Sequence, residues 1–573
     1  MRRTASLRMV GEVFAAALIG VSALTLAAST FANDDRDHGK KANKAHRSHA
    51  LVLTNGTIYT MDDKDPTKAR VVKEVLIKNG RFAEVGKKVD RSDKVRVVDL
   101  RGRVVIPGII DPHTHIVLVA NRPGYHTPME HVFTIPEAIA EYLVRAAEMN
   151  AAGVPPDQFI TTIGPIAARQ FAEQRLPDIT ELNAIPRPVY IQAAQGGIRA
   201  NNAAAAWFAA NNPAVIVNAT TGAVSGPALQ TLRLAFLTHE TRKRTAHNAL
   251  QYYTTLGITT HGDSGAFHSE LPSNGIANEN TYTMHFPLLA LNREKNLPAR
   301  MRIDFLHQDP ASDTALTTLA PRLRNSFPYF GDDWLRTRGI GEFTGGGVPG
   351  LVAIGKAGWR GEDHSLSLSN FLGLVANRQI THDQLIAEGY PDGISKLRWV
   401  ISHVPGTTEA SVNQWKAMGG GLLVGWGPTR GPSATGAPIG PAYRTLFDNG
   451  IPLGYHADGG DITVINPWMN FYTMITGRNL SGDLVNAGQT LTRWETLWLA
   501  TAANKWFVSE DDLGSIEVGN HGDLVVLDRD FFDPVKVPDS EIPRIRSILT
   551  IVGGKIVHDA GALRGHRRDD DDD

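Results

Sequence analysis

The two ends of this chain share a β-hairpin pattern. Of all its sequence features, this similarity most restricts the folds that the chain can adopt. Apolar β-forming residues flank an Asn-Gly or Gly-Gly pair in Leu51–Tyr59, Val75–Phe82 and Leu549–Val557. Both residues of such a pair adopt positive φ readily, which predicts a two-residue hairpin. Between the ends, Ile135–Asn150 and Ser481–Ala503 carry helical periodicity instead. We therefore predict one small β-sandwich domain formed by both termini, with an α/β domain inserted into it.

Short apolar runs that read as strands alternate with helical segments through the middle of the chain. The strand candidates are Val104–Asp111, Phe159–Gly164, Val189–Ala194, Gly257–His261, Arg302–Leu306, Gly339–Phe343, Trp399–His403, Gly421–Gly425 and Ile451–His456. Alternation of strands and helices implies a parallel sheet, and this number of strands suits a closed (β/α)8 TIM-like barrel. Which strands belong to insertions stays open, while Ala200–Trp207 and Ala266–Asn280 resemble loop or insertion material.

The N-terminus has the pattern of an export signal. Arg2, Arg3 and Arg8 precede an apolar run over residues 13–28, and small residues up to Ala32 suit cleavage by a signal peptidase. The alternative is a membrane anchor, but the run is shorter than the ~20 residues that a spanning helix needs. We expect cleavage and a periplasmic or secreted protein without a stable membrane anchor. The choice between the general and the twin-arginine export route stays open.

These features divide the chain into segments. The prediction is a signal peptide over 1–32, a disordered leader over 33–50, the first part of the β domain over 51–106, the barrel over 107–505, the second part of the β domain over 506–562 and a charged tail over 563–573. The leader is crowded with charged residues and histidine and lacks the apolar residues that a packed core requires.

Composition excludes several classes of site. The sequence has no cysteine, so disulfides, thiolate metal sites and cysteine nucleophiles are all excluded. The formal net charge is -1, which favours neither nucleic acid nor an anionic membrane as a partner. The 20 histidines are the imidazole source for any metal site.

The most specific chemical motif is a pair of histidines at the end of a predicted strand. Side chains alternate between the two faces of a strand, so His113 and His115 project the same way and can chelate one cation. A bare His-x-His pair could equally lie on a surface. Here an apolar strand, the Pro107-Gly108 turn and Asp111 precede it, which is a more specific context.

With these residues the sequence resembles the amidohydrolase superfamily. The segment Pro107–His115 is similar to the start of that family's barrel, and Gly514–Asp528 is similar to its return to the β domain. Gly331–Leu335 and the overall length resemble amidohydrolase family 3 in particular. The resemblance implies a (β/α)8 barrel with one or two divalent metals at its mouth, and hydrolysis by metal-activated hydroxide.

The family pattern also implies two later histidines and a late aspartate. His403 and Asp458 each follow a predicted strand and match two of these positions. His364 is the choice for the remaining histidine, in preference to His382, which sits in a segment that resembles a helix start. Asp458 would be both a metal ligand and the catalytic proton carrier, although Asp461 lies close to it in sequence.

The bridging position departs from the common family pattern. Many relatives carry a carbamylated lysine there, whereas Gly339–Phe343 contains no lysine and one glutamate, Glu342. A glutamate offers two oxygens and a negative charge, so we predict that Glu342 bridges two metals. A register shift of one residue would turn this side chain to the other face and leave a single metal.

Other residues have weaker claims to the site. Asp111 shares a face with His113 and could orient a ligand from behind. The predicted substrate contacts are His261, His456, Trp426 and Arg430, for which structural roles are the alternative; Trp468 is equally a pocket or a core residue.

The sequence therefore predicts an exported, metal-dependent hydrolase of non-peptide carbon–nitrogen bonds. It would cleave an amide, a cyclic amide or a related bond of a small molecule with one or two divalent metal ions, of which zinc fits best. The alternatives are a mononuclear deaminase and a non-catalytic binding or regulatory barrel. No nucleic-acid partner is expected, and homo-oligomerisation is left open.

Overall fold

The computed structural model describes residues 50–91, 95–194, 197–266, 281–425, 427–434, 439–460 and 463–562. The predicted signal peptide, the charged tail, Trp426 and Asp461 lie outside these residues, as does the predicted leader except for Ala50, which begins the first strand. Within the described ranges, no helix has the length and apolar character needed to cross a membrane.

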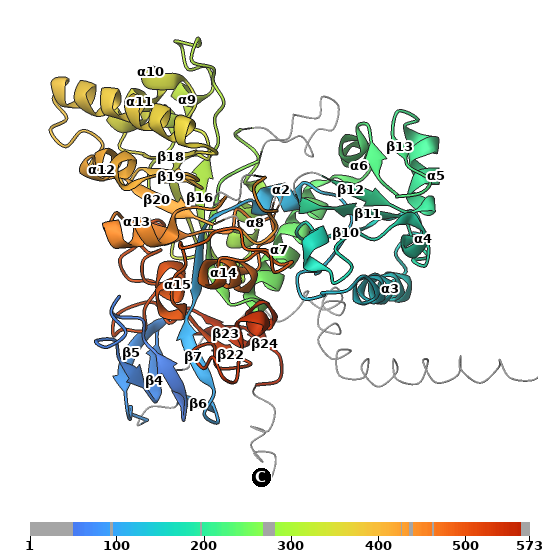
Figure 1. Cartoon of the computed structure of the whole chain (residues 1–573), viewed down its shortest axis with the longest axis horizontal. Helices are drawn as coiled ribbons and strands as arrows, with labels where there is room; N and C mark the ends of the chain where they lie inside the picture. Colours follow the sequence, from blue (N-terminus) through green and yellow to red (C-terminus); the bar gives the residue numbers. More distant parts are fainter. Residues whose placement is uncertain are drawn as a thin grey trace, which may run out of the picture.

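Eight parallel strands form the barrel at the centre of the molecule, in the order β21-β20-β19-β18-β17-β16-β15-β8 (Figure 1). Their bounds are β8 Ile109–Thr114, β15 Ile258–Asp263, β16 Arg300–Phe305, β17 Leu335–Ile340, β18 Arg360–His364, β19 Val400–Ser402, β20 Gly421–Val424 and β21 Leu453–Tyr455. The first and last strands meet through a parallel bridge between Thr114 and Gly459. The predicted α/β barrel is thus confirmed.

One strand prediction needs correction, and one strand of the barrel was missed. Val104–Asp111 is two strands, because β7 (Val104–Pro107) joins another sheet before β8 enters the barrel. The chain passes between them at Gly108, where a Cβ atom would lie 2.1 Å from Thr259 Oγ1. The candidates at 159–164 and 189–194 are strands, as predicted, and form β10 and β11 of a separate sheet, so they are insertion strands of the kind that the sequence left open. Strand β18 was not among the candidates.

That separate sheet belongs to an inserted subdomain between β8 and β15, which lies beside the barrel in Figure 1. Its elements are β9 Tyr125–Thr127, α3 Ile135–Ala151, β10 Ile160–Thr162, η3 Ala168–Gln170, α4 Ile179–Leu182, β11 Val189–Gln192, β12 Ile198–Ala200, α5 Asn202–Asn211, β13 Ile216–Val217, β14 Val224–Ser225 and α6 Ala228–Phe236. Ala200–Trp207 is thus mostly helix α5, which the Asn201 side chain caps.

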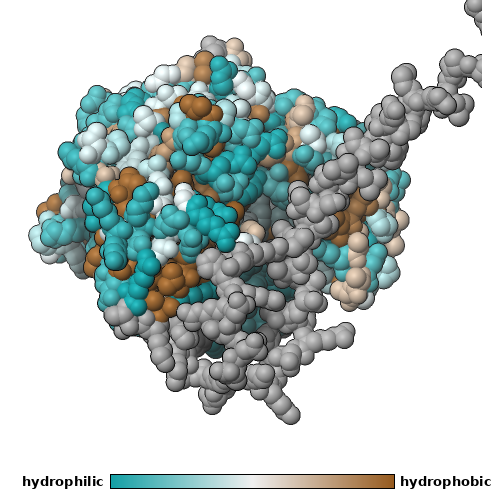
Figure 2. Space-filling view, turned by 90° about the horizontal axis from the view of Figure 1, so that it is seen from below, coloured by the Kyte–Doolittle hydropathy of each residue, from teal (hydrophilic) through white to brown (hydrophobic). Residues whose placement is uncertain are grey.

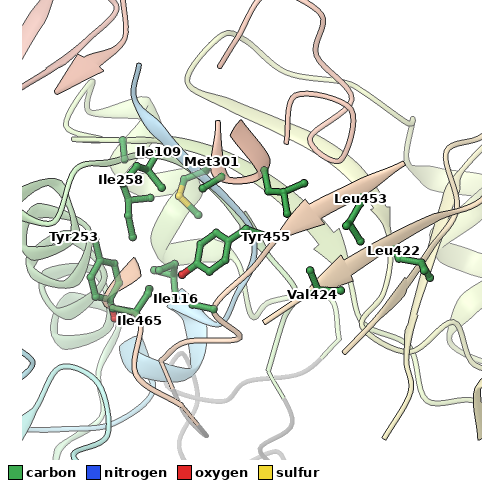
Figure 3. Close-up of a cluster of buried hydrophobic side chains, with 14 of the residues drawn as sticks. Ile109, Ile116, Tyr253, Ile258, Met301, Leu422, Val424, Leu453, Tyr455 and Ile465 are labelled. Atoms are coloured by element: carbon green, nitrogen blue, oxygen red, sulfur yellow. The ribbon is translucent and has the colours of Figure 1, made fainter. Parts of the chain in front are cut away.

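Helices pack around the outside of the barrel. They are α2 Ile116–Ala120, α7 His239–Thr255, α8 Phe286–Arg293, α9 Leu319–Asn325, α10 Gly347–Lys356, α11 Leu368–Ala387, α12 Glu409–Ala417, α13 Tyr443–Asn449, α14 Pro467–Thr476 and α15 Arg493–Ala500. Of the helix predicted at 481–503, only α15 forms, because Thr492 caps its N-terminus. Figure 3 shows the core between layers, where Ile109, Ile258 and Met301 from neighbouring strands lie near Tyr253 of α7.

Both chain ends build the β domain, which consists of sheets in the orders β5-β4-β1-β6 and β24-β23-β22-β7-β2-β3. The bounds are β1 Ala50–Thr54, β2 Thr57–Tyr59, β3 Val71–Val72, β4 Glu74–Lys78, β5 Arg81–Gly86, β6 Val95–Asp99, β22 Leu524–Leu527, β23 Ser547–Val552 and β24 Lys555–Asp559; a 3-10 helix, η6, spans Asp539–Arg544. Leu53 and Val75 share one apolar core with Val526 and Leu549. The exposed surface in Figure 2 is mostly hydrophilic, with small apolar groups.

Two of the three predicted hairpins are confirmed. Asn79-Gly80 joins β4 to β5 and Gly553-Gly554 joins β23 to β24, and all four turn residues have positive φ. The prediction at Asn55-Gly56 is wrong, because β1 and β2 lie in different sheets. The chain crosses there between the layers, and a Cβ atom on Gly56 would lie 2.6 Å from Leu100 Cδ1.

Candidate metal centre

Six predicted ligands converge at the carboxyl ends of the barrel strands, where (β/α)8 enzymes place their active sites. His113 lies near the end of β8 and His115 directly follows it, Glu342 follows β17, His364 ends β18, His403 follows β19 and Asp458 follows β21. Their ligand atoms form two groups that share Glu342. We call the group that contains Asp458 the buried half and the group that contains His364 the exposed half.

The buried half consists of His113, His115, Glu342 and Asp458, whose ligand atoms all lie within 4.8 Å of one another. His115 Nε2 is 3.0 Å from Glu342 Oε2 and 3.1 Å from Asp458 Oδ1. His113 Nε2 is 3.5 Å and 3.4 Å from the same two oxygens. None of these side chains is more than 3% exposed, so the group is closed to bulk solvent.

The exposed half consists of Glu342, His364 and His403. The second oxygen of Glu342, Oε1, lies 2.5 Å from His364 Nδ1, and the Phe343 ring packs edge-on against the His364 ring at 4.4 Å. The His364 side chain is 24% exposed, so this half faces the barrel mouth. Each oxygen of Glu342 thus faces one half.

Charge and burial set the protonation of these groups. Burial opposes protonation of His113 and His115, but the carboxylates beside them raise the pKa of both imidazoles well above the ordinary value. Burial would raise the pKa of Glu342 and Asp458, yet the surrounding imidazoles lower it well below the usual range. Both carboxylates are therefore anionic at neutral pH.

The donor set fits a divalent cation. Imidazole nitrogens and carboxylate oxygens are the ligands of zinc and related ions, and they surround two positions here. His113 Nε2 and Glu342 Oε2 are buried without a hydrogen-bond partner, which is costly unless another group satisfies them. A cation held between the imidazoles and the carboxylates would satisfy both atoms.

The other ring nitrogens of the histidine pair are fixed from behind. His113 Nδ1 lies 2.5 Å from Glu362 Oε1, and His115 Nδ1 lies 2.9 Å from the carbonyl oxygen of Gly265. Both contacts direct Nε2 toward the centre. The sequence prediction missed Glu362, although its position two residues before His364 on one strand is the signal that could have found it.

The Asp111 side chain bonds backbone N–H groups and not the ring of a metal-binding histidine. Its carboxylate accepts hydrogen bonds from the backbone N–H groups of His113, at 3.3 Å, and of Ala457, at 3.2 and 3.3 Å. Burial raises the pKa of this carboxyl to about 7. Asp111 therefore links β8 to the segment that carries Asp458.

The inserted subdomain also fixes the segment after Asp458. Glu130 Oε1 accepts a hydrogen bond from the backbone N–H of Ile465 at 2.8 Å, and Arg122 Nη2 donates to the Gly460 carbonyl at 3.1 Å. Both side chains are buried, and burial raises the pKa of Glu130 to about 8. The subdomain is thus part of the scaffold of the buried half.

The structure separates the remaining predicted site residues. The His456 ring lies 5.0 Å from the His113 ring and 4.8 Å from the His403 ring, directly beside the centre. The His261 ring is buried on β15 and packs 5.5 Å from the ring of Tyr253 of α7. Arg430 is half-buried in the segment after β20.

Two alternatives from the sequence lie away from the centre. His382 is within helix α11, where its Nδ1 accepts a hydrogen bond from Ile394. Trp468 is a core residue whose indole N–H donates to the Leu256 carbonyl.

Comparison with known sequences gives a long match. The sequence profile of the Amidohydrolase family matches residues 96–363 and 372–558. An N-substituted formamide deformylase from Arthrobacter pascens is 27% identical over 139 residues, which is 24% of each chain. Dihydropyrimidinase 1 from Caenorhabditis briggsae is 42% identical over 69 residues, 12% of this chain and 13% of that protein. The matches span about a quarter or less of the length of these curated relatives.

Solved structures share the fold. An uncharacterized metal-dependent hydrolase from Pyrococcus furiosus superimposes with a TM-score of 0.53 at 17% identity, over 84% of this chain and 100% of that one. The triazine hydrolase from Arthobacter aurescens superimposes with a TM-score of 0.50 at 14% identity, over 89% and 95% of the two chains.

Proposed function

The chain belongs to the amidohydrolase family, and on that premise we propose that it is a binuclear metal-dependent hydrolase of a small molecule. The bond cleaved is an amide, a cyclic amide or a related carbon–nitrogen bond. The observation that carries this proposal is the place of Glu342, which belongs to both ligand groups.

A shared carboxylate is what two adjacent cations require. Two positive charges ~3.5–4 Å apart repel strongly unless an anion lies between them. Glu342 directs Oε2 toward His115 in the buried half and Oε1 toward His364 in the exposed half. It therefore supplies the negative charge at the position that a bridging ligand would occupy.

The reaction follows from the groups around this position. A bound divalent metal lowers the pKa of coordinated water from 15.7 to about 7, which supplies a nucleophile at neutral pH. Asp458 is anionic and lies at the edge shared by His115 and His403, with its second oxygen 3.7 Å from His403 Nε2. It is placed to accept a proton from the attacking water and to return it to the leaving nitrogen.

Metal analysis and a substrate screen test the proposal together. Elemental analysis of the purified protein should find about two divalent ions per chain, and a panel of amides, cyclic amides and formamides should include a hydrolysed member. One ion per chain with deamination in place of amide hydrolysis would support the mononuclear deaminase. Metal-free protein without turnover would support a non-catalytic barrel.

Zinc is the proposed metal, because imidazole and carboxylate are its common ligands in hydrolases. Manganese, iron and nickel accept the same donor set. Reconstitution of metal-stripped protein with each ion separately should give the highest turnover with zinc.

We also propose that the protein is exported. The support is the arginine and apolar pattern of residues 1–32. Mass spectrometry of the protein recovered from the periplasm or medium should show a mature chain that begins near Asn33, whereas an intact Met1 in a membrane fraction would contradict export.

A further inference from the structure

The barrel interior beneath the metal centre is filled by charge. Arg338 of β17, Arg360 and Glu362 of β18 and Asp304 of β16 are all fully buried. In most (β/α)8 barrels this space holds branched apolar side chains. Buried charges destabilise a fold unless they are paired and hydrogen-bonded, so an interior of this kind needs a reason.

The four charges form one closed network. Arg360 Nη2 donates to Glu362 Oε2 at 2.6 Å, and its Nη1 donates to Asp304 Oδ2 at 3.0 Å. Arg338 donates through Nε to Asp304 Oδ1 at 2.9 Å, and its Nη2 lies 3.7 Å from Glu362 Oε2. Two guanidinium groups thus match two carboxylates, and the network is neutral as a whole.

Glu362 divides its two oxygens between this network and the metal centre. Oε2 faces the arginines, whereas Oε1 lies 2.5 Å from His113 Nδ1 and accepts a hydrogen bond from Ser402 Oγ at 2.6 Å. The ion pairs with the arginines involve only Oε2 of Glu362, so they do not account for the position of Oε1. The contact to His113 is therefore a separate function of the same side chain.

We propose that Glu362 is a positioning residue of the metal centre, in which its Oε1 accepts a hydrogen bond from the Nδ1–H group of His113. This inference rests on the proposed function. With the proton fixed on Nδ1, the lone pair of Nε2 points at the space between Glu342 and Asp458. A metal-binding histidine gains both ring orientation and basicity from such a carboxylate. The arginines hold Glu362 in place, so the interior charge supports the ligand.

Two variants and a matched control test this role. Glu362→Gln keeps the volume but removes the charge, and Glu362→Asp keeps the charge but withdraws the carboxylate from His113. Asp363→Asn is the control, because Asp363 also lies on β18 and is buried, but bonds Thr344 and Arg378 on the opposite side of the strand. Circular dichroism first establishes that each variant is folded.

The measurement is zinc affinity, by competition with a chromophoric chelator on the full chain, together with the visible spectrum of the cobalt-substituted protein. Of the two zinc ions, both Glu362 variants should bind the more tightly held one about 10–100-fold more weakly than the wild type does. The spectrum of their cobalt-substituted forms should also differ from that of the wild type. The control should keep the wild-type affinity and spectrum.

The outcomes separate this inference from the proposed function. Metal binding by the wild type with unchanged affinity in either folded Glu362 variant would overturn the inference alone. An equal loss in Asp363→Asn would assign the effect to general destabilisation and would also overturn it. A wild-type protein that binds no zinc would overturn the proposed function and this inference with it.

Discussion

The two halves of the metal centre share Glu342 but differ in how the chain builds them. The buried half takes two histidines from the end of β8 and Asp458 from the segment after β21, and its side chains are at most 3% exposed. The exposed half takes single histidines from β18 and β19, and His364 is 24% exposed. Asp458 therefore gives the buried half a second carboxylate, whereas Glu342 alone supplies the negative charge of the exposed half.

The largest effect should come from removal of the strand pair. His113→Ala combined with His115→Ala deletes both nitrogens of the buried half, so we expect loss of that metal and of all measurable turnover. Elemental analysis and an activity assay measure this. His382→Ala is the matched control, because that histidine lies in helix α11 away from the centre; a full metal complement in the double variant would contradict the assignment.

Asp458→Asn should abolish proton transfer and weaken the metal of the buried half, which has Asp458 among its ligands. The substitution keeps the size of the side chain but removes its basicity, so kcat should fall by ~10²–10⁴-fold. The exposed half contains no ligand from Asp458 and should keep its metal. Near-normal kcat would transfer the proton-carrying role to another residue, with His456 beside the centre as the first candidate.

Glu342→Gln tests the dependence of one half on the other. Without the shared negative charge, two cations should not be held together, and the variant should bind about one metal where the wild type binds two. The remaining ion should occupy the buried half, where Asp458 still provides an anion. Two tightly bound metals in this variant would show that the halves are independent.

His364→Ala should give a smaller effect that added metal reverses. The exposed half would keep only Glu342 and His403, so its affinity should drop while the buried half stays occupied. Raising the zinc concentration should restore occupancy by mass action and with it part of the activity. A matching loss from the buried half, seen as fewer than one tightly held metal, would contradict the predicted order of affinities.

The smallest expected effect is a change in the pH dependence of stability, and it concerns Glu130, which holds the segment after Asp458. Burial raises the pKa of Glu130 to about 8 from an ordinary 4.5. The folded protein therefore holds this proton more tightly than the unfolded chain does. Its contribution to stability is complete below about pH 4.5 and is lost as the pH rises to about 8.

Glu130→Gln removes this proton equilibrium and retains the acceptor for Ile465. The free energy of unfolding should therefore vary less between pH 4.5 and 8 in the variant than in the wild type. Chemical denaturation at several pH values measures the difference. Parallel pH profiles for the two proteins would contradict a neutral Glu130 in the folded state.

The same contrast explains what the sequence could predict. His113 and His115 are two residues apart at the end of one predicted strand, so strand alternation alone places them on one face. His364 was found only through the family pattern, because Arg360–His364 is polar and does not read as a strand. Its arginine and glutamate are buried by partners on other strands, which no local pattern reveals.

The β domain gives a second example of this limit. Asn79-Gly80 and Asn55-Gly56 are similar in sequence, yet only the first closes a hairpin. After Asn55 the chain passes into the other sheet and pairs with β7 and β3. An Asn-Gly pair favours a tight turn, but the strands available for pairing on either side determine whether that turn closes a hairpin.

The closure between β8 and β21 has a consequence for how the molecule comes together. His115 and Asp458 are 343 residues apart in the chain. The segments at the ends of β8 and β21 that carry them are joined by backbone hydrogen bonds from His115 N–H to the Gly459 carbonyl and from Asp458 N–H to the His113 carbonyl. The buried half therefore does not exist until the last strand of the barrel has docked onto the first. Contacts of such long range form slowly, because the loop they close is large. A cation bound between these segments would stabilise only the closed barrel, because its ligands come together only after β21 has joined β8.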